Sequence, residues 1–337
     1  MPRRSCAGRG FRTGLLAQWG TQIADPYDAA VAILINPYSR VPQWREAFET
    51  LLEGEDLRWY PDIGDPADIE FVVAWLMSRG ELSELPNLQA ILCLGAGTEQ
   101  WQKPGMPDVP VVRLADPAMA DQMAAYAVSY VVRHQRGFAG VEQLQRERSW
   151  TIPTTPQTWS YRIGILGHGT IGARIGQAFA ALGYPVNAWT RSHRETPGVT
   201  HYAGADQLDD FLGASNVVIN VLPSTESTTG LLTRERFDRF APDALFINVG
   251  RGTVIESDGA LVAALDDGPL AAAILDVTSP EPLPDDSPLW DHPAVTLTPH
   301  LSGVTQVRSA AQVVAANIAR FRAGEPVEPL LDRTRGY

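Results

Sequence analysis

The stretch from Arg162 to Ser192, RIGILGHGTIGARIGQAFAALGYPVNAWTRS, decides the fold of this chain. It begins with a short apolar run at 163–166 that predicts a buried strand. The pattern G-x-G-x-x-G follows at 167–172, and a second apolar run at 186–189 comes one βαβ unit later. Glycines in this pattern allow a tight turn, a close approach of backbone to a pyrophosphate, and close packing of helix on strand. The stretch therefore predicts a dinucleotide site at a helix N-terminus.

Strands and helices alternate on both sides of this stretch. Four strands are predicted before it, at 31–35, 71–75, 90–94 and 111–114, and four after it, at 217–221, 245–249, 272–275 and 295–297. With the two strands above, the later set makes a six-stranded Rossmann sheet. Helices are predicted at 43–52, 118–136, 207–212, 234–240, 258–265 and 307–321. The fold class is therefore α/β, with two doubly wound parallel-sheet domains.

Composition limits the partners and the compartment. The chain has 337 residues, 45% of them hydrophobic and 20% charged, which is typical of a globular protein with two domains. Its net charge of −12 argues against nucleic acid or an anionic membrane surface as a partner. Cys6 and Cys93 are too few for a disulfide framework and lack metal-ligand spacing, so we expect a reducing cytoplasm and no metal site.

The first 28 residues differ from the rest of the chain. They carry Arg3, Arg4, Arg9 and Arg12 before any acidic residue, and they contain no apolar core of a secretory signal. We expect a disordered extension that adds nothing to the fold.

The end of the second Rossmann strand predicts which dinucleotide binds. A carboxylate there would bind the ribose 2′-hydroxyl of NAD, but the sequence has Thr190, Arg191 and Ser192, then Arg194, and no carboxylate until Glu195. Arginines and hydroxyls bind a 2′-phosphate by charge-assisted hydrogen bonds. NADP(H) is therefore the predicted cofactor, with NAD(H) as the alternative.

Three polar residues directly follow strands of the same sheet. They are Arg251 after 245–249, Glu281 after 272–275 and His300 after 295–297. Ligands of open α/β sheets bind beyond these strand ends. An arginine can hold a substrate carboxylate, a histidine can deliver a proton to a keto oxygen, and a carboxylate can orient that imidazole. We therefore predict hydride transfer to a 2-keto acid, with these three residues as the catalytic set.

Five motifs, in order, resemble the D-isomer-specific 2-hydroxyacid dehydrogenases. They are GHGTIG at 167–172, LPSTESTTG at 222–230, NVGRGTVIE at 248–256, LDVTSPEPLP at 275–284 and TPHLSG at 298–303. Three further segments resemble the glyoxylate/hydroxypyruvate reductase A branch: LGAG at 94–97, MADQMAAYAV at 119–128 and DRTRGY at 332–337. That branch prefers NADPH, which agrees with the cofactor predicted from residues 190–194. The resemblance runs from about residue 31 to the end. The chain departs from the pattern at Thr98 and Glu99, where the family often has Val-Asp, and at 193–196.

The resemblance implies further site residues. Arg251, Glu281 and His300 are the implied catalytic set, and Asp276 is an implied partner of the nicotinamide carboxamide. The substrate is expected to contact Arg251 and His300 and also Trp44, Gly95, Ala96 and Gly97. The residues expected to bind the cofactor are Gly167, His168, Gly169, Thr170, Ile171, Gly172, Thr190, Arg191, Ser192, Leu222, Pro223, Val249, Gly250 and Asp276.

The resemblance also implies an architecture. A flavodoxin-like substrate domain is expected at 29–127 and 304–337, interrupted by a Rossmann NADP-binding domain at 128–303. A homodimer is implied, with the helix at 118–136 as a candidate interface.

The predicted function is NADPH-dependent reduction of glyoxylate, hydroxypyruvate or a similar small 2-keto acid to the (R)-2-hydroxy acid, with His300 as the proton donor. Two alternatives stay open. One is a dehydrogenase of the same family for a bulkier 2-keto acid. The other is a nucleotide-sensing binding protein on the same fold.

Overall fold

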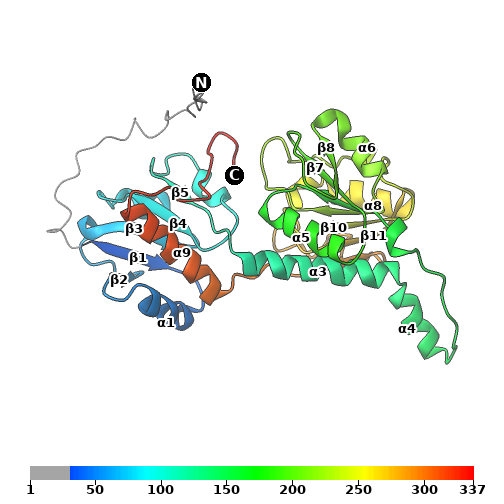
Figure 1. Cartoon of the computed structure of the whole chain (residues 1–337), viewed down its shortest axis with the longest axis horizontal. Coiled ribbons are helices and arrows are strands. Elements are labelled where there is room, and N and C mark those ends of the chain that lie inside the picture. Colours follow the sequence, from blue (N-terminus) through cyan, green and yellow to red (C-terminus); the bar gives the residue numbers. More distant parts are fainter. Residues whose placement is uncertain (1–30) are drawn as a thin grey trace, which may run out of the picture.

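The computed structural model describes residues 31–337, which form two α/β units, each built on a fully parallel sheet (Figure 1). The first sheet has the order β2-β1-β3-β4-β5, which is the flavodoxin-like order. Its strands are β1 (Ala32–Asn36), β2 (Asp56–Trp59), β3 (Ile69–Ala74), β4 (Ala90–Cys93) and β5 (Val111–Val112). The expected extension at 1–28 lies outside the described residues.

The second sheet has the order β12-β11-β10-β9-β6-β7-β8, the Rossmann order with one more strand. Its strands are β6 (Ile163–Leu166), β7 (Val186–Thr190), β8 (Val199–Ala203), β9 (Val217–Asn220), β10 (Ala244–Asn248), β11 (Leu270–Leu275) and β12 (Val295–Leu297). The order reverses between β6 and β9, where Leu166 pairs with Asn220. The predicted fold class is confirmed.

Both faces of the first sheet are buried because helices cover each of them. Along β1, Ile33 and Ile35 pack in one apolar cluster with Phe48 and Val314, whereas Leu34 packs in another with Trp101. The alternation follows from the pleat of a strand. The helices of this unit are α1 (Val41–Leu51), α2 (Arg79–Ser83) and α9 (Val307–Arg322).

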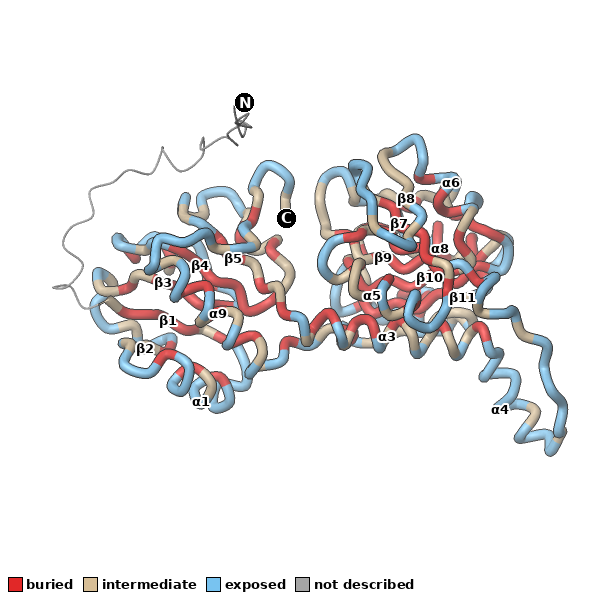
Figure 2. The backbone as a smooth tube through the Cα atoms, in the orientation of Figure 1, coloured by how far each residue is buried: buried red, intermediate tan, exposed pale blue. Residues whose placement is uncertain are grey.

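The second sheet is covered in the same way. Ile165 and Ile247 face the cluster that includes Phe179, whereas Phe246 faces the cluster that includes Phe211 and Leu261. The helices of this unit are α3 (Pro117–Gln135), α4 (Phe138–Arg146), α5 (Thr170–Ala181), α6 (Leu208–Gly213), α7 (Arg234–Phe237) and α8 (Asp258–Asp266). In Figure 2 the buried backbone follows the strands and α3, while α4 projects into solvent.

The chain crosses between the two units twice, and the two crossings pack against each other. Outward, it runs along α3; on the return, it passes through 303–306 into α9, which packs on α1 of the first unit. The side-chain amide of Gln122 on α3 donates to the carbonyl of Val304 at 2.9 Å. Gly303 lies so close to α3 that an added Cβ would be 2.8 Å from Cγ of Met123. The first unit is therefore discontinuous in sequence. The expected boundary between residues 127 and 128 falls inside α3, which continues through it without a break.

Four helices and strands were missing from the prediction: β2, β8, α4 and the five-residue helix α2. β2 (Asp56–Trp59) and β8 (Val199–Ala203) mix polar and apolar residues and are mostly only partly buried, so neither gives a continuous apolar run. None of the side chains of α4 is buried, although its apolar residues Phe138, Val141 and Leu144 recur every third position, so the prediction passed over a short helix that lies outside both cores. The Rossmann sheet accordingly has seven strands and not six. No helix within 31–337 is long and apolar enough to cross a membrane.

Candidate active site

Arg251 stands in the turn that follows β10, and two buried asparagines fix that turn. Asn220 Nδ2 donates to Asn248 Oδ1 at 2.8 Å, and Asn248 in turn receives the N–H of Gly250 at 3.2 Å and donates to the carbonyl of Arg251 at 3.1 Å. Both asparagine side chains are fully buried. Buried amides satisfied in this way hold the backbone in one conformation. The guanidinium therefore starts from a rigid base.

His300 and Glu281 form the hydrogen-bonded pair that the sequence predicted. His300 Nδ1 lies 2.9 Å from Glu281 Oε2, and the other oxygen of Glu281 accepts the N–H of Thr278 at 3.1 Å. The two side chains are 52% and 39% exposed, so the imidazole is accessible. With Nδ1 bound to a carboxylate, Nε2 is the ring nitrogen that faces a ligand. This pair can hold a proton at Nε2 and deliver it.

Asp276 builds the loop that carries His300. Its buried carboxylate accepts the N–H of Leu301 at 2.8 Å, the N–H of Ser302 at 2.9 Å and the hydroxyl of Thr298 at 2.6 Å. The backbone of His300 adopts a left-handed conformation, with φ of 50°, that side chains rarely adopt. These bonds hold that conformation in place. Asp276 thus positions His300, and the expected contact with a carboxamide stays a prediction.

One pocket of about 290 Å³ brings the catalytic set together. It is lined by Arg251, Glu281 and His300, and by one residue of the first unit, Glu99. The Nε of Arg251 donates to Glu99 Oε1 at 2.8 Å, and Nη1 donates to the carbonyl of Gly250 at 2.7 Å. The three residues predicted to be catalytic therefore share a pocket at the carboxyl ends of the strands.

The glycine loop of the first unit reaches this pocket at its last residue. A Cβ added at Gly97 would lie 2.2 Å from Nη2 of Arg251. A Cβ added at Gly95 would lie 2.8 Å from the ring of Trp75, a half-exposed side chain directly after β3. The backbone of this loop, including Ala96, thus lies between an indole and a guanidinium.

Trp44 requires a correction. The resemblance placed it at the substrate, but the structure buries it in the core of the first unit, where its ring stacks on Phe48 with centroids 5.5 Å apart. Trp44 is on the inward face of α1, and it is absent from the lining of the pocket. Trp75, which sequence reasoning missed, is the tryptophan beside the glycine loop. Its signal was its position directly after a predicted strand.

The loop after β6 fits a dinucleotide. Gly167 has φ of 104°, which favours glycine, and a Cβ at Gly172 would lie 2.0 Å from the carbonyl oxygen of Gly167. Gly169 is the N-cap of α5, its position opens onto free space, and no side chain caps the helix. The N–H groups of Thr170 and Ile171 begin that helix. Free N–H groups beside open space are suited to a pyrophosphate.

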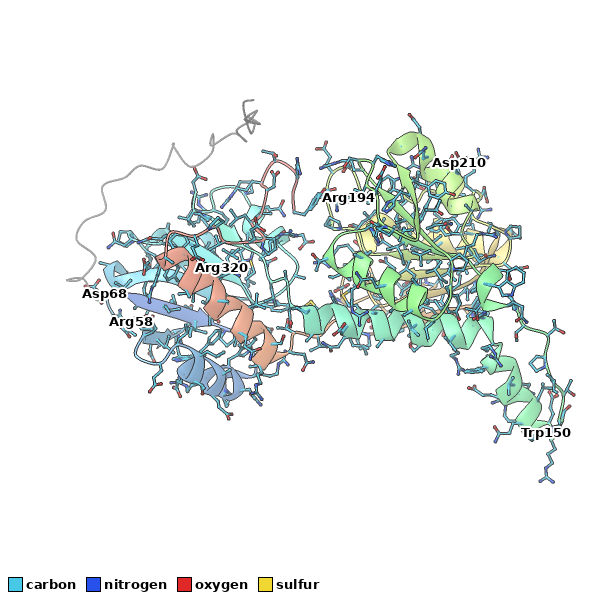
Figure 3. All side chains as sticks on the ribbon, viewed as in Figure 1. Arg58, Asp68, Trp150, Arg194, Asp210 and Arg320 are labelled. Atoms are coloured by element: carbon cyan, nitrogen blue, oxygen red, sulfur yellow. The ribbon has the colours of Figure 1, made fainter. Side chains whose placement is uncertain are left out.

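The residues expected to select the dinucleotide are the last residue of β7 and those just after it. Thr190 donates its hydroxyl to the carbonyl of Ser192 at 2.8 Å, and the guanidinium of Arg191 lies 5.7 Å from the ring centroid of Tyr337, which belongs to the first unit. Arg194 donates to the carbonyl of His168 at 3.4 Å. Figure 3 shows Arg194 at the edge of the second unit that faces the first.

Three histidines lie near Arg194: His168, which the sequence analysis expected at the cofactor, and His193 and His201, which it did not. The rings of His168 and His201 are 5.2 Å apart, and those of His193 and His201 are 6.5 Å apart. Burial first, then the neighbouring charges of histidine and Arg194, lower the pKa of both His168 and His201. Both rings are therefore neutral at pH 7. Within 31–337, no group of three or more His, Cys, Asp or Glu side chains is placed to hold a metal ion.

Residues 128–302 match the family model described as D-isomer specific 2-hydroxyacid dehydrogenase, NAD binding domain. The glyoxylate/hydroxypyruvate reductase A of Serratia proteamaculans (strain 568) is 37% identical over 313 residues, which cover 90% of this chain and 99% of that protein. The chain belongs to the D-isomer-specific 2-hydroxyacid dehydrogenase family, which confirms the resemblance, and it is an NAD(P)-dependent dehydrogenase.

Solved structures of the family agree with the fold. A D-isomer specific 2-hydroxyacid dehydrogenase from Xanthobacter autotrophicus Py2, in complex with NADPH and MES, has a TM-score of 0.85 and 38% identity, covering 92% of this chain and all of that one. An NADPH-dependent glyoxylate/hydroxypyruvate reductase from Sinorhizobium meliloti, in complex with NADP and sulfate, has a TM-score of 0.84 and 30% identity, covering 91% of this chain and all of that one.

Proposed function

We propose that this protein reduces glyoxylate, hydroxypyruvate or a similarly small 2-keto acid to the (R)-2-hydroxy acid, with NADPH as the hydride donor. The observation that carries the proposal is the single pocket in which Arg251 and the His300–Glu281 pair meet. Relatives named glyoxylate/hydroxypyruvate reductase A, 35% to 37% identical over 90% of the chain, support the substrate class.

Each side chain of the pocket has a separate role in this proposal. Arg251 binds the carboxylate and the keto oxygen of the substrate, since its guanidinium offers parallel N–H donors. His300 holds a proton at Nε2 and transfers it to the keto oxygen, whose negative charge grows as hydride arrives. Glu281 orients the imidazole through Nδ1 and stabilises its protonated form.

NADP(H) is the proposed cofactor, and when bound it supplies the hydride. The open N-terminus of α5 would take the pyrophosphate, and Thr190, Arg191 and Ser192 would lie near the 2′-phosphate. Leu222 and Gly250 close the same crevice, since a Cβ at Gly250 would lie 2.7 Å from the carbonyl of Leu222. Pro223 and Val249 continue these two turns. Relatives crystallised with NADPH or NADP support this preference over NAD(H).

We also propose the domain boundaries given by the resemblance, 29–127 with 304–337 for the substrate and 128–303 for the cofactor.

A second copy of the chain is the proposed partner. The segment 138–160, here called the arm, exposes large apolar side chains at Phe138, Trp150, Ile152 and Trp159. Half of the apolar side chains of α3 are buried within its own chain and nearly all of the others are partly buried, so the arm is the better interface.

The test is NADPH oxidation with glyoxylate and with hydroxypyruvate, repeated with His300→Ala. Loss of a positioned general acid is expected to lower kcat by about 100- to 10,000-fold. Binding of NADPH, followed by fluorescence, should be retained because His300 is outside the glycine loop. Undiminished turnover in the variant would contradict the role of His300. Binding of NADPH without reduction of any keto acid would favour a nucleotide-sensing protein, and a preference for branched or aromatic keto acids would favour the bulkier substrate class.

A further inference from the structure

Glu99 occupies one edge of the Arg251 guanidinium. Its two carboxylate oxygens accept hydrogen bonds from Nε at 2.8 Å and from Nη2 at 3.4 Å, so the contact is side-on and bidentate. The carbonyl of Gly250 accepts one N–H of Nη1. A guanidinium has five N–H groups in one plane. Two of them remain, one on each terminal nitrogen, Nη1 and Nη2.

This arrangement fixes the edge of the guanidinium that a substrate can use. Two N–H groups match a carboxylate, or a carboxylate oxygen with the neighbouring keto oxygen. Glu99 comes from the first unit and Arg251 from the second, and both line the pocket with His300. The contact therefore orients Arg251 across the boundary between the units.

Glu99 is ionised at neutral pH. Partial burial acts to raise the pKa of its carboxyl, but the charge and hydrogen bonds of Arg251 and the N–H groups of Glu99 and Thr98 act to lower it, and the net pKa lies below the ordinary value. The negative charge is therefore present whenever a keto acid binds.

The charges of the pocket are already nearly balanced. Arg251 is compensated by Glu99, and His300 is paired with Glu281. The other side chains that line the pocket are neutral: Ser224, Thr253, Thr278, Ser279 and Pro280. One substrate carboxylate can use the free edge of Arg251, but a second carboxylate on the same molecule would meet Glu99 or Glu281 without an unpaired cation.

We propose that Glu99 is a specificity-determining residue, which orients Arg251 toward one carboxylate and excludes 2-keto acids that carry a second one. The inference rests on the proposed reduction of 2-keto acids. Repulsion of the wrong ligand is a common source of specificity, and here it acts on charge and not on size.

The experiment compares hydroxypyruvate with ketomalonate, which has the same carbon number and carries a carboxylate in place of the hydroxymethyl group. Oxaloacetate is a second dicarboxylate probe, and kcat and KM are measured for each with saturating NADPH. The wild-type protein is expected to favour hydroxypyruvate. In Glu99→Gln the ratio of kcat/KM for ketomalonate to that for hydroxypyruvate should rise at least about tenfold, as expected when one close repulsive charge is removed. The change should appear mainly in KM for the dicarboxylates.

Two control variants separate charge from structure. Glu99→Asp retains the charge and should retain the rejection of ketomalonate, even where the shorter side chain lowers kcat for hydroxypyruvate. Glu84→Gln removes an equal charge from an exposed position of the first unit and should leave the ratio unchanged. A wild-type enzyme that reduces ketomalonate as well as hydroxypyruvate, or an unchanged ratio in Glu99→Gln, would overturn the inference alone. Failure of the wild-type protein to reduce any 2-keto acid would instead overturn the proposed function.

Discussion

The guanidinium of Arg251 contacts residues of both units. At Gly97 the backbone lies so close to it that no side chain would fit unless the guanidinium moved. An added Cβ at this position would lie 2.2 Å from Nη2 of Arg251 and 2.9 Å from Oε2 of Glu99. Contacts this short are relieved by moving the ends of flexible side chains, and here those ends are the groups that bind the substrate.

Gly97→Ala should therefore reduce activity without unfolding the protein. We expect kcat/KM for glyoxylate to fall about 10- to 100-fold, because misplacing a binding group by about an ångström has an effect of this size. The thermal midpoint should shift little, since no backbone atom is among the near contacts of that Cβ. Steady-state kinetics and a thermal melt of the same sample measure both. A variant with normal kinetics would show that Arg251 adapts freely.

Single residues differed in how well the sequence predicted them. Arg251, Glu281 and His300 were predicted to lie together because parallel strands end at the same edge of a sheet, and one pocket holds all three. Trp44 was assigned wrongly to the substrate because the sequence pattern does not tell an inward helix face from a pocket wall. Glu99 was visible only as a departure from the family pattern, and its partner is 152 positions away.

At the scale of elements, the glycines of the turn from β6 to α5 have different roles. Gly172 must lack a side chain because the carbonyl of Gly167 occupies that space, so its role is in packing. Gly169 has an extended backbone and open space around its Cβ position, so nothing within the protein requires glycine there.

The two glycines should accordingly respond differently to alanine. Gly172→Ala is expected to destabilise the protein by about 1–3 kcal/mol through overpacking, measured by chemical denaturation. Gly169→Ala should leave stability within about 0.5 kcal/mol of the wild type, because it touches no protein atom. It should weaken NADPH binding roughly tenfold, measured by fluorescence titration, because its methyl group enters the space proposed for the pyrophosphate. Equal losses of stability in both variants would contradict this division.

Helices and strands were predictable where burial requires a regular pattern of apolar residues in their sequence. The central strands of both sheets are continuous apolar runs, and the long helices α3 and α9 carry apolar stripes, so all of these were found. β2 and β8 were not, because their residues are mixed polar and apolar and mostly only partly buried. α4 was missed although its apolar residues at 138, 141 and 144 recur at helical spacing, because the run is short and follows directly on the longer helix α3.

At the scale of the whole molecule, the arm at 138–160 is the largest departure from a closed shape. It extends beyond the end of α3, away from both sheets, and Figure 3 shows Trp150 at its tip. Trp150 is fully exposed and Ile152 is 89% exposed. Large apolar side chains gathered on one projecting segment favour an interface.

The double substitution Trp150→Ser with Ile152→Ser should weaken self-association. Light scattering after size exclusion is expected to give twice the mass of one chain for the wild type and a concentration-dependent shift toward one chain for the variant. Leu182→Ser, at an exposed apolar position outside the arm, should behave as the wild type. A wild-type mass of one chain at micromolar concentration would contradict the proposed partner.

The paired crossings at α3 and 303–306 also bear on how the protein could be rebuilt. Because Gly303 packs on Met123, the nucleotide-binding unit leaves and rejoins the rest of the chain at a single place. A segment whose two ends lie close together can be replaced as a unit, because any replacement whose ends are equally close fits the same two junctions. The coenzyme-binding part of a relative could therefore be transplanted here while the substrate-binding part is kept.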